Sequence, residues 1–257
     1  MKQFTVDAFT DKIFGGNPAA VCVVETFPPA ELMQNIAMEN NFSETAFVAR
    51  EGNAYRLRWF TPAVELDFCG HATLATAFVL FNFYEQTSNR IEFETLHGKF
   101  TVERRGKLFE MNFPAYKPKR IPVTEAMSAA IHAPISEAYL ARDLIMVLES
   151  AEVVEKLAPD FDKLSRLDGL TQAVTAAGKE FDCVSRVFAP KVNVPEDPVT
   201  GSTHCAIIPY WAARLGKERL TARQASKRGG VLHCEVAGER VKISGSAALY
   251  AVADLQV

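Results

Sequence analysis

The sequence predicts an α+β protein made of two similar domains, each with strands around one buried central helix. Three observations lead to this fold class. The chain has 257 residues, which is long for one hydrophobic core and comfortable for two domains. One segment has the length of a helix and is apolar around nearly its whole circumference, so it must be buried on all sides. Landmarks of the first half recur in the second half at a nearly constant spacing, which indicates an internal duplication.

The buried helix is expected from His71 onward, inside the stretch formed by residues 60–83. Asp67, Cys69 and other polar residues precede its N-terminus, whereas its far end is almost entirely apolar. The backbone N–H groups at a helix N-terminus favour an anion, and a glycine at position 70 lets a ligand approach the backbone closely. We therefore expect a small-molecule site at the N-terminus of this helix.

The rest of the first half alternates between apolar runs and turn residues, as strands and hairpins do. A helix is expected at Ala30–Asn40, where apolar residues keep helical spacing. The expected strands are Lys2–Ala8, Ala19–Val24, Phe42–Val48, Tyr55–Phe60, Arg90–Phe93, Lys99–Glu103 and Lys107–Phe113.

Three prolines within nine residues, Pro114, Pro118 and Pro122, mark the best domain boundary. The expected domains are therefore residues 1–115 and 116–257. The expected elements beyond the boundary are strands at Ala141–Leu148, Leu170–Ala176 and Asp182–Ala189 and helical segments at Ser150–Leu157 and Asp160–Leu167. Residues 191–216 then repeat the character of the opening stretch, with a turn rich in acid and proline, a glycine and a mostly apolar helix.

Matched landmarks in the two halves support the duplication. The pairs are Phe60-Thr61-Pro62 with Phe188-Ala189-Pro190, Gly70-His71 with Gly201-Ser202 at an offset of 131, and Gly98 and Gly106 with Gly230 and Gly238 at an offset of 132. Two such halves are expected to face each other, so that the N-termini of their central helices converge on one cleft. Domain interfaces are favoured sites for ligands.

Composition excludes several classes of function. Hydrophobic residues make up 48% of the chain and charged residues 23%, and the formal net charge is only -3, which is typical of a globular protein that attracts neither nucleic acid nor an acidic membrane. Five cysteines without a C-x-x-C pair are expected to be reduced thiols. Because the N-terminus enters strand-like alternation without a signal-peptide pattern, we expect a cytoplasmic protein.

The residues near the two helix N-termini favour proton transfer. Two N-termini that face each other would hold a carboxylate-bearing substrate and stabilise the negative charge of an enol or enolate. Glu44, His71 and Asp197 are the proton carriers of this arrangement. Such chemistry needs no metal and no redox cofactor. The competing interpretation of Glu44 is a solvated glutamate at a strand edge, since glutamate is seldom buried unless it is paired.

Three other kinds of site have less support. A Ser-His-Asp hydrolase from Asp197, Ser202 and His204 is disfavoured, because residues two apart on a helix point about 200° apart and no G-x-S-x-G turn is present. A metal site from Cys69, His71, His204 and Cys205 lacks the usual two-residue spacing of zinc pairs. Nucleotide binding has neither a G-x-G-x-x-G nor a Walker sequence to support it.

Several motifs in one order resemble the phenazine biosynthesis PhzF-like isomerase family, essentially from end to end. They are Asn17-Pro18 after two glycines, Ser43-Glu44-Thr45, Thr61-Pro62 through Cys69-Gly70-His71-Ala72-Thr73, and Glu196-Asp197-Pro198-Val199-Thr200-Gly201-Ser202. The resemblance implies a diaminopimelate-epimerase-like fold, in which two pseudo-symmetric domains each form a β-barrel or roll around a central helix. It also implies a homodimer.

The resemblance assigns roles to individual residues. It implies that Glu44 is the general acid/base and that His71 and Asp197 act beside the substrate. Substrate-binding residues implied by the family motifs are Asn17, Gly70, Gly201 and Ser202. The expected partner is a small-molecule carboxylate, with no cofactor, no metal, no nucleic acid and no membrane.

The sequence departs from the related two-base epimerases at one of the two helix N-termini. Those enzymes have a cysteine before each glycine, and here Cys69 has that place in the first half while Thr200 has it in the second. A symmetric two-thiol racemase is therefore disfavoured. The leading hypothesis is a cofactor-independent isomerase that shifts a proton and a double bond. The alternatives are an amino-acid racemase or epimerase that uses Cys69 with a carboxylate, and a non-catalytic protein that binds a ligand or a protein partner.

Overall fold

A computed structural model describes residues 1–96 and 98–257 of the chain. It divides into two compact units, one formed by Met1–Asn112 together with Ser244–Val257 and the other by Phe113–Ile243. His97, between the expected strands Arg90–Phe93 and Lys99–Glu103, lies outside the described residues. No helix in the described ranges is long and apolar enough to cross a membrane.

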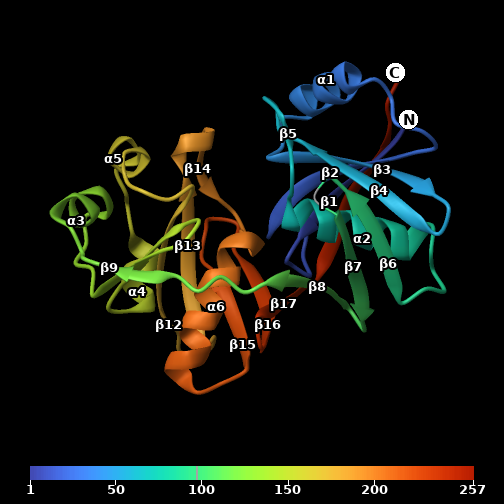
Figure 1. The fold of residues 1–257 in the computed structure, drawn as a ribbon. Helices are drawn as coiled ribbons and strands as arrows, with labels where there is room; N and C mark the ends of the chain where they lie inside the picture. Colours follow the sequence, from blue (N-terminus) through green and yellow to red (C-terminus); the bar gives the residue numbers. More distant parts are fainter. Residues whose placement is uncertain (97) are drawn as a thin grey trace. The chain divides into compact units, whose positions relative to one another are not determined.

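The first unit consists of strands around a central helix, α2, with a second helix, α1, on the outside (Figure 1). Its strands are β1 (Lys2–Ala8), β2 (Asn17–Val24), β3 (Glu44–Glu51), β4 (Ala54–Phe60), β5 (Glu65–Leu66), β6 (Arg90–Thr95), β7 (Gly98–Arg105), β8 (Leu108–Pro114) and β18 (Ala247–Asp254). Its helices are α1 (Ala30–Asn40) and α2 (Gly70–Phe83).

Pairing in the first unit runs from β18 to β8. β1 pairs antiparallel with β18 and β2, β2 pairs parallel with β3, and β3 pairs antiparallel with β4. β4 pairs antiparallel with β5 and parallel with β6, and β6, β7 and β8 continue as antiparallel neighbours. α2 packs against β1, β2, β3, β7 and β18. The strands thus cover the helix from several sides, as the sequence predicts for an apolar helix.

The central helix of this unit buries even its polar side chains. Thr73 and Thr76 are fully buried within α2, and each hydroxyl donates to the backbone carbonyl four residues earlier, at 2.6 and 2.7 Å. This local bond satisfies a hydroxyl that would otherwise cost free energy in an apolar core. The helix can therefore carry threonines inside the barrel, and its apolar residues fill the remaining space.

The second unit repeats this arrangement around α6. Its strands are β9 (Lys119–Ile121), β10 (Glu137–Leu140), β11 (Leu144–Val147), β12 (Gln172–Ala177), β13 (Cys183–Ala189), β14 (Val194–Asp197), β15 (Arg219–Gln224), β16 (Gly230–Ala237) and β17 (Arg240–Gly245). Its helices are α3 (Glu125–Ile131), α4 (Ala151–Lys156), α5 (Phe161–Ser165), the 3₁₀ turn η1 (Pro190–Val192) and α6 (Gly201–Leu215).

The strand pairings of the second unit match those of the first in order and direction. β10 pairs antiparallel with β9 and β11, and β11 pairs parallel with β12. β12 pairs antiparallel with β13, which pairs antiparallel with β14 and parallel with β15, and β15 pairs antiparallel with β16. The pairs from β9 to β16 in the second unit therefore have the same order and direction as the pairs from β18 to β7 in the first unit. The α+β class with two pseudo-symmetric domains, each a β-roll around a central helix, is confirmed.

The units differ from the expected ranges 1–115 and 116–257 at the C-terminus. β18 returns to the first unit, where it pairs along the whole of β1, and the backbone N–H of Phe9 donates to the carbonyl of Ser246 at 2.8 Å. The first unit thus acquires the strand that β9 supplies to the second. A strand that pairs across nearly the full length of the chain leaves no local signal in the sequence.

Two expectations in the second half also differ from the structure. The run Ala141–Leu148, expected as one strand, contains a turn before the shorter strand β11, because the backbone N–H of Ala141 donates to the carbonyl of Asp143. α3 was not expected. Its start is set by Thr124, whose side chain accepts a hydrogen bond from the N–H of Met127, as N-cap threonines do.

Candidate active site

The first group of site residues lies where β2, β3 and α2 begin. Asn17 is the first residue of β2, Glu44 the first of β3 and His71 the second of α2. β2 and β3 run parallel, with Ala19 opposite Glu44, so the two strands start at the same edge of the sheet. The sequence predicts all three residues as site residues, and the structure brings their side chains together.

The approach to Asn17 requires a glycine. Gly16 has a φ of +57°, and a Cβ atom at this position would lie 2.0 Å from the carbonyl oxygen of Ala8. Both the conformation and the space therefore exclude a side chain. This glycine lets the chain turn from β1 into β2 with Asn17 fully buried beside His71.

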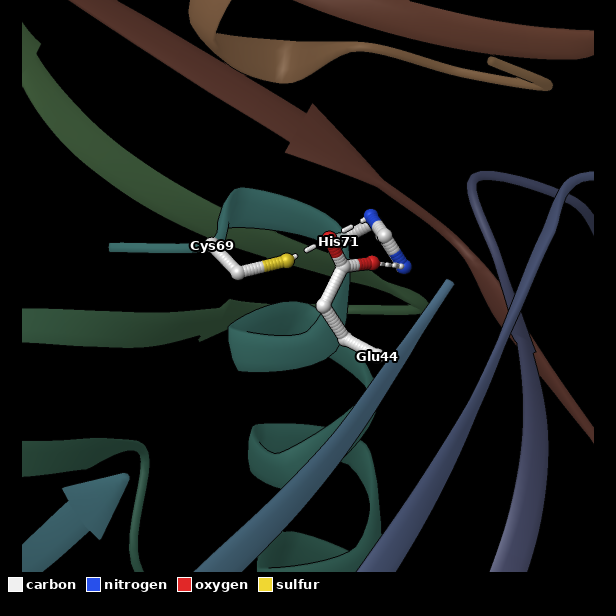
Figure 2. Close-up of side chains that lie close together, drawn as sticks. All are labelled: Glu44, Cys69 and His71. Atoms are coloured by element: carbon white, nitrogen blue, oxygen red, sulfur yellow. Dashed lines mark hydrogen bonds and ion pairs between the residues drawn. The ribbon is translucent and has the colours of Figure 1, made fainter. Parts of the chain in front are cut away.

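His71 is the centre of this group, and its two ring nitrogens face different partners (Figure 2). Nε2 lies 3.0 Å from Oε2 of Glu44, an ion-pair distance, although neither atom has a hydrogen bond of acceptable angle with any described residue. Nδ1 lies 3.1 Å from the side-chain amide of Asn17 and 3.5 Å from Sγ of Cys69. An amide group can present either its oxygen or its nitrogen to the ring, so Asn17 suits either protonation state of His71.

The environment of His71 favours its protonated form. Burial of the imidazole acts to lower the pKa of His71, but Cys69 and Glu44 beside it raise this pKa, and the net result lies well above the ordinary value. Burial also raises the pKa of the Cys69 thiol, which keeps that thiol neutral near pH 7. The carboxylate of Glu44 is therefore the charge that holds the proton on His71.

Glu44, Cys69 and His71 also have the donor types that a zinc ion takes, with ligand atoms within 4.8 Å of one another. Their contacts nevertheless fit a proton relay better than a metal site. Cys69 contacts Nδ1 and Glu44 contacts Nε2, which are two different nitrogens of the imidazole (Figure 2). A metal ion binds one imidazole nitrogen, so a single ion cannot use both contacts as they stand.

The second group of site residues belongs to the other unit and surrounds the start of α6. Asp197 ends β14, and its carboxylate accepts a short hydrogen bond from the hydroxyl of Thr200. The fully buried Gln224 holds both ends of this turn, since its amide donates to the carbonyl of Asp197 at 2.6 Å and accepts from the N–H of Thr200 at 2.8 Å. The position of Asp197 is thus fixed by buried polar contacts.

Neither N-cap residue uses its side chain to cap its helix. Cys69 precedes α2 and Thr200 precedes α6, and no side-chain cap hydrogen bond exists at either position. The first N–H groups of a helix have no partner inside the helix, so these two N-termini suit an anionic ligand. Gly70 and Gly201 are the first residues of the two helices, and their role in ligand binding stays a prediction.

Arg142 and Asp143 complete the second group, and sequence reasoning missed both. Arg142 donates to the two carboxylate oxygens of Asp143 at 3.1 and 2.6 Å and to the hydroxyl of Ser202 at 2.9 Å. Asp143 is buried and also accepts from the hydroxyl of Thr203 at 2.9 Å. The sequence did contain a signal, namely two adjacent charges at the start of an otherwise apolar run.

Strand register shows how the two groups correspond. Phe60 lies opposite Thr45 and Phe188 lies opposite Gln172, so the counterpart of Glu44 in the second unit is the uncharged Thr171. The matched glycines make Ser202 the counterpart of His71. The pair of carboxylate and imidazole therefore occurs in the first unit, and its counterpart in the second unit is a pair of hydroxyl side chains.

Comparisons with known proteins agree with the fold. Residues 6–253 match the family PhzC-PhzF, described as phenazine biosynthesis-like protein. An uncharacterized isomerase of Pseudomonas aeruginosa is 49% identical over 247 residues, which cover 96% of this chain and 95% of that protein. A crystal structure of a phenazine biosynthesis PhzF family protein from Enterococcus faecalis is 49% identical, with a TM-score of 0.98 over 100% of this chain and 99% of that one.

The fold is shared more widely than the sequence. A probable proline racemase from Agrobacterium radiobacter superposes with a TM-score of 0.65 over 100% of this chain and 93% of that one. Its sequence is only 11% identical, so the likeness concerns the fold alone.

Proposed function

Because the chain belongs to the phenazine biosynthesis-like PhzC-PhzF family, we propose that it is an isomerase that moves a proton, and with it a double bond, within a small carboxylate. The family and the isomerase names of the relatives support the general class. The reaction type, the substrate class and the absence of a metal or cofactor are our proposal. We also keep the sequence-based expectation that the substrate lies between the N-termini of the two central helices.

The observation that carries this proposal is the contact between Glu44 and His71. Both side chains are largely buried, with 14% and 6% of their surfaces exposed, and Nε2 lies 3.0 Å from Oε2. In such a pair the carboxylate is the group that can accept a proton, and the imidazolium is the group that can donate one. A buried pair of this kind is typical of sites for acid and base catalysis.

In the proposed reaction, Glu44 takes a proton from a carbon next to the substrate carboxylate and returns it at another carbon. The negative charge that develops on the substrate is stabilised by the N–H groups at the start of a central helix. His71 stays protonated and stabilises the negative charge beside it. Asp197 exchanges a proton with a heteroatom of the substrate. Each of these steps moves only protons and the electrons of one double bond.

A racemase is the second candidate, and the contact between Cys69 and His71 favours it. The Sγ atom lies 3.5 Å from Nδ1, and a racemase would need His71 in its neutral form to take the thiol proton over this distance. A racemase of the two-base kind, however, needs a second acid on the opposite face of the substrate carbon. Thr200 has the corresponding place in the second unit, and a threonine hydroxyl is a much weaker acid than a thiol.

Solvent-deuterium exchange distinguishes these functions without a prior guess about the product. A panel of small unsaturated and amino carboxylates is incubated with the protein in D₂O and followed by NMR. An isomerase gives deuterium at carbon together with new olefinic signals, whereas a racemase gives deuterium at one stereocentre with an unchanged carbon skeleton. A purified, folded protein that exchanges no carbon-bound proton in any member of the panel would count against both enzymes.

A further inference from the structure

The guanidinium of Arg142 is fixed in place by three neighbours in the second unit. Nε and Nη2 donate to the buried carboxylate of Asp143, and Nη2 also donates to the hydroxyl of Ser202. The guanidinium carbon lies 6.0 Å from the centre of the Tyr116 ring. Planar, two-point contacts of this kind hold an arginine in one orientation.

One edge of this guanidinium remains available. No hydrogen bond from Nη1 of Arg142 to a residue in the described ranges 1–96 and 98–257 exists, and the side chain is 34% exposed. The two N–H groups of Nη1 therefore have no protein partner within these ranges, beside the first turn of α6. A carboxylate can accept a charge-assisted hydrogen bond from Nη1.

Arg186 shows what a purely structural arginine in the same unit does. It also donates through Nε and Nη2 to one carboxylate, that of Glu196, at 2.6 and 2.9 Å. Its Nη1, however, is used by the backbone carbonyl of Leu157 at 2.6 Å. Arg142 and Arg186 thus each donate through Nε and Nη2 to a carboxylate, but only Arg186 also uses Nη1 within the protein. Of the two, only Arg142 keeps Nη1 donors for a ligand.

The negative charge of Asp143 does not prevent Arg142 from attracting an anion. Its two oxygens are also bound by the hydroxyl of Thr203 at 2.9 Å and by the N–H of Thr171 at 3.4 Å, so its negative charge is shared among three donor groups. The N-terminus of α6 adds partial positive charge next to Ser202. The surface formed by Arg142 and Ser202 is therefore favourable for an anion.

We propose that Arg142 binds the carboxylate of the substrate and selects for it, with Asp143 as the residue that positions the guanidinium. This inference rests on the proposed function in one respect, that the substrate is a carboxylate. It assigns different tasks to the two similar units. The first carries the titrating pair Glu44 and His71, and the second, where their counterparts are Thr171 and Ser202, carries a fixed cation.

The test uses acetate as the simplest carboxylate and NMR spectra of ¹⁵N-labelled full-length protein. In the wild type, acetate between 1 and 100 mM should shift the Nε–Hε signal of Arg142 and the amide signal of Ser202 in a saturable way. Acetamide, which has the same shape without the charge, should shift neither. In Arg142→Gln the acetate affinity should fall by about tenfold or more, as expected for the loss of a charge-assisted hydrogen bond.

Two further variants keep the test decisive. Arg142→Lys keeps the charge without the fork and should give an intermediate affinity, which also covers the case in which Arg142→Gln fails to fold. Arg214→Gln removes a more exposed arginine of the same unit, ion-paired to Glu137, and should leave acetate binding unchanged. If acetate shifts neither signal in the wild type, or shifts Ser202 equally in Arg142→Gln and Arg142→Lys, the proposal is wrong.

Failure of this inference can be distinguished from failure of the proposed function. Acetate binding requires no turnover, so the acetate titration tests Arg142 even if no substrate is found by deuterium exchange. For any substrate found by deuterium exchange, Arg142→Gln should raise KM by about tenfold with a smaller effect on kcat, which is the pattern of lost binding. Unchanged KM in Arg142→Gln together with normal deuterium exchange would contradict the role of Arg142 and leave the isomerase intact.

Discussion

Two buried histidines near the starts of the central helices show how local surroundings decide protonation. His71 lies beside a carboxylate, and its pKa is raised well above the ordinary value. His204 lies in α6 and has only neutral partners, since its Nδ1–H donates to the carbonyl of Thr200 at 2.8 Å and its Nε2 accepts from the hydroxyl of Ser185 at 3.1 Å. Burial therefore lowers the pKa of His204 to about 4.

Sequence motifs predicted which residues belong to the site, but they did not predict which side chains contact one another. Glu44, His71 and Asp197 have recognisable neighbours in the sequence, whereas the contact of Asn17 with His71 spans 54 residues. Arg142 sits in a run that has the pattern of a strand, and only the fold brings it to Ser202, 60 residues later. Patterns reveal which residue types can do chemistry, and long-range packing decides which of them meet.

We predict that His71 carries a proton at neutral pH and that Glu44 is the cause. ¹⁵N NMR of the imidazole between pH 5 and 9 should show imidazolium signals above pH 6.5 in the wild type and a lower pKa in Glu44→Gln. Since the folded-state pKa of His71 is raised, its contribution to stability is present below the unfolded pKa of about 6.5 and is lost as pH rises through the folded pKa. A neutral His71 at pH 6.5 in the wild type would refute the charged pair.

We predict the opposite pH dependence for His204. Its pKa is lowered from 6.5 to about 4, so its contribution to stability is present above pH 6.5 and is lost as pH falls toward 4. The unfolding free energy of the wild type should fall by up to about 3 kcal/mol over this range, beyond the fall seen in His204→Gln. Urea unfolding at several pH values measures this difference. Parallel curves for the two proteins would show that His204 is not kept neutral by the fold.

At the scale of elements, the sequence predicted the long helices best. α2 and α6 are apolar nearly all round, and α1 was predicted at Ala30–Asn40, its observed bounds. Elements of two to four residues such as β5, β9 and β10 have too few residues to show a period, and their pairing with neighbouring strands defines them. The turn within Ala141–Leu148 was missed for the same reason.

We predict that Cys69→Ala leaves both α2 and catalysis largely intact. The thiol does not cap the helix, and Glu44, the base of the proposed proton transfer, contacts the other nitrogen of the imidazole. Deuterium exchange should proceed within a few-fold of the wild-type rate, and the far-UV circular dichroism should be unchanged. A loss of about a thousandfold with the fold preserved, equivalent to roughly 4 kcal/mol of transition-state stabilisation, would instead support the racemase.

At the scale of the whole molecule, the two units repeat one order of strand pairing, and the chain closes the first unit with its last strand. The matched glycines predicted the repeat. Gly106 and Gly238 serve the same kind of turn in the two halves, with φ angles of +65° and +63°. The return of β18 was not predictable, since β8 and β17 end their units alike and nothing local shows where the last strand will pair.

We predict that deletion of Ala247–Val257 unfolds the first unit. β1 would lose one of its two antiparallel partners along all seven residues and expose that edge, and an uncovered edge strand promotes aggregation. The truncated protein should lose the cooperative urea transition of the first unit and elute as aggregate on size exclusion. Deletion of Gln256 and Val257 alone is the control and should unfold like the wild type. A truncated protein that keeps both transitions would mean that β18 is dispensable.

The central claim is that Glu44 is the base that moves the substrate proton, and deuterium exchange in Glu44→Gln tests it most directly. Glutamine keeps the shape of the side chain and removes its basicity, and loss of a positioned general base typically costs about 10² to 10⁴ in rate. With a substrate found for the wild type, the folded variant should still bind that substrate, measured by NMR titration, and its deuterium uptake should fall by at least about a hundredfold. Normal uptake in folded Glu44→Gln would show that Glu44 is a structural residue of β3 and would contradict the proposed mechanism.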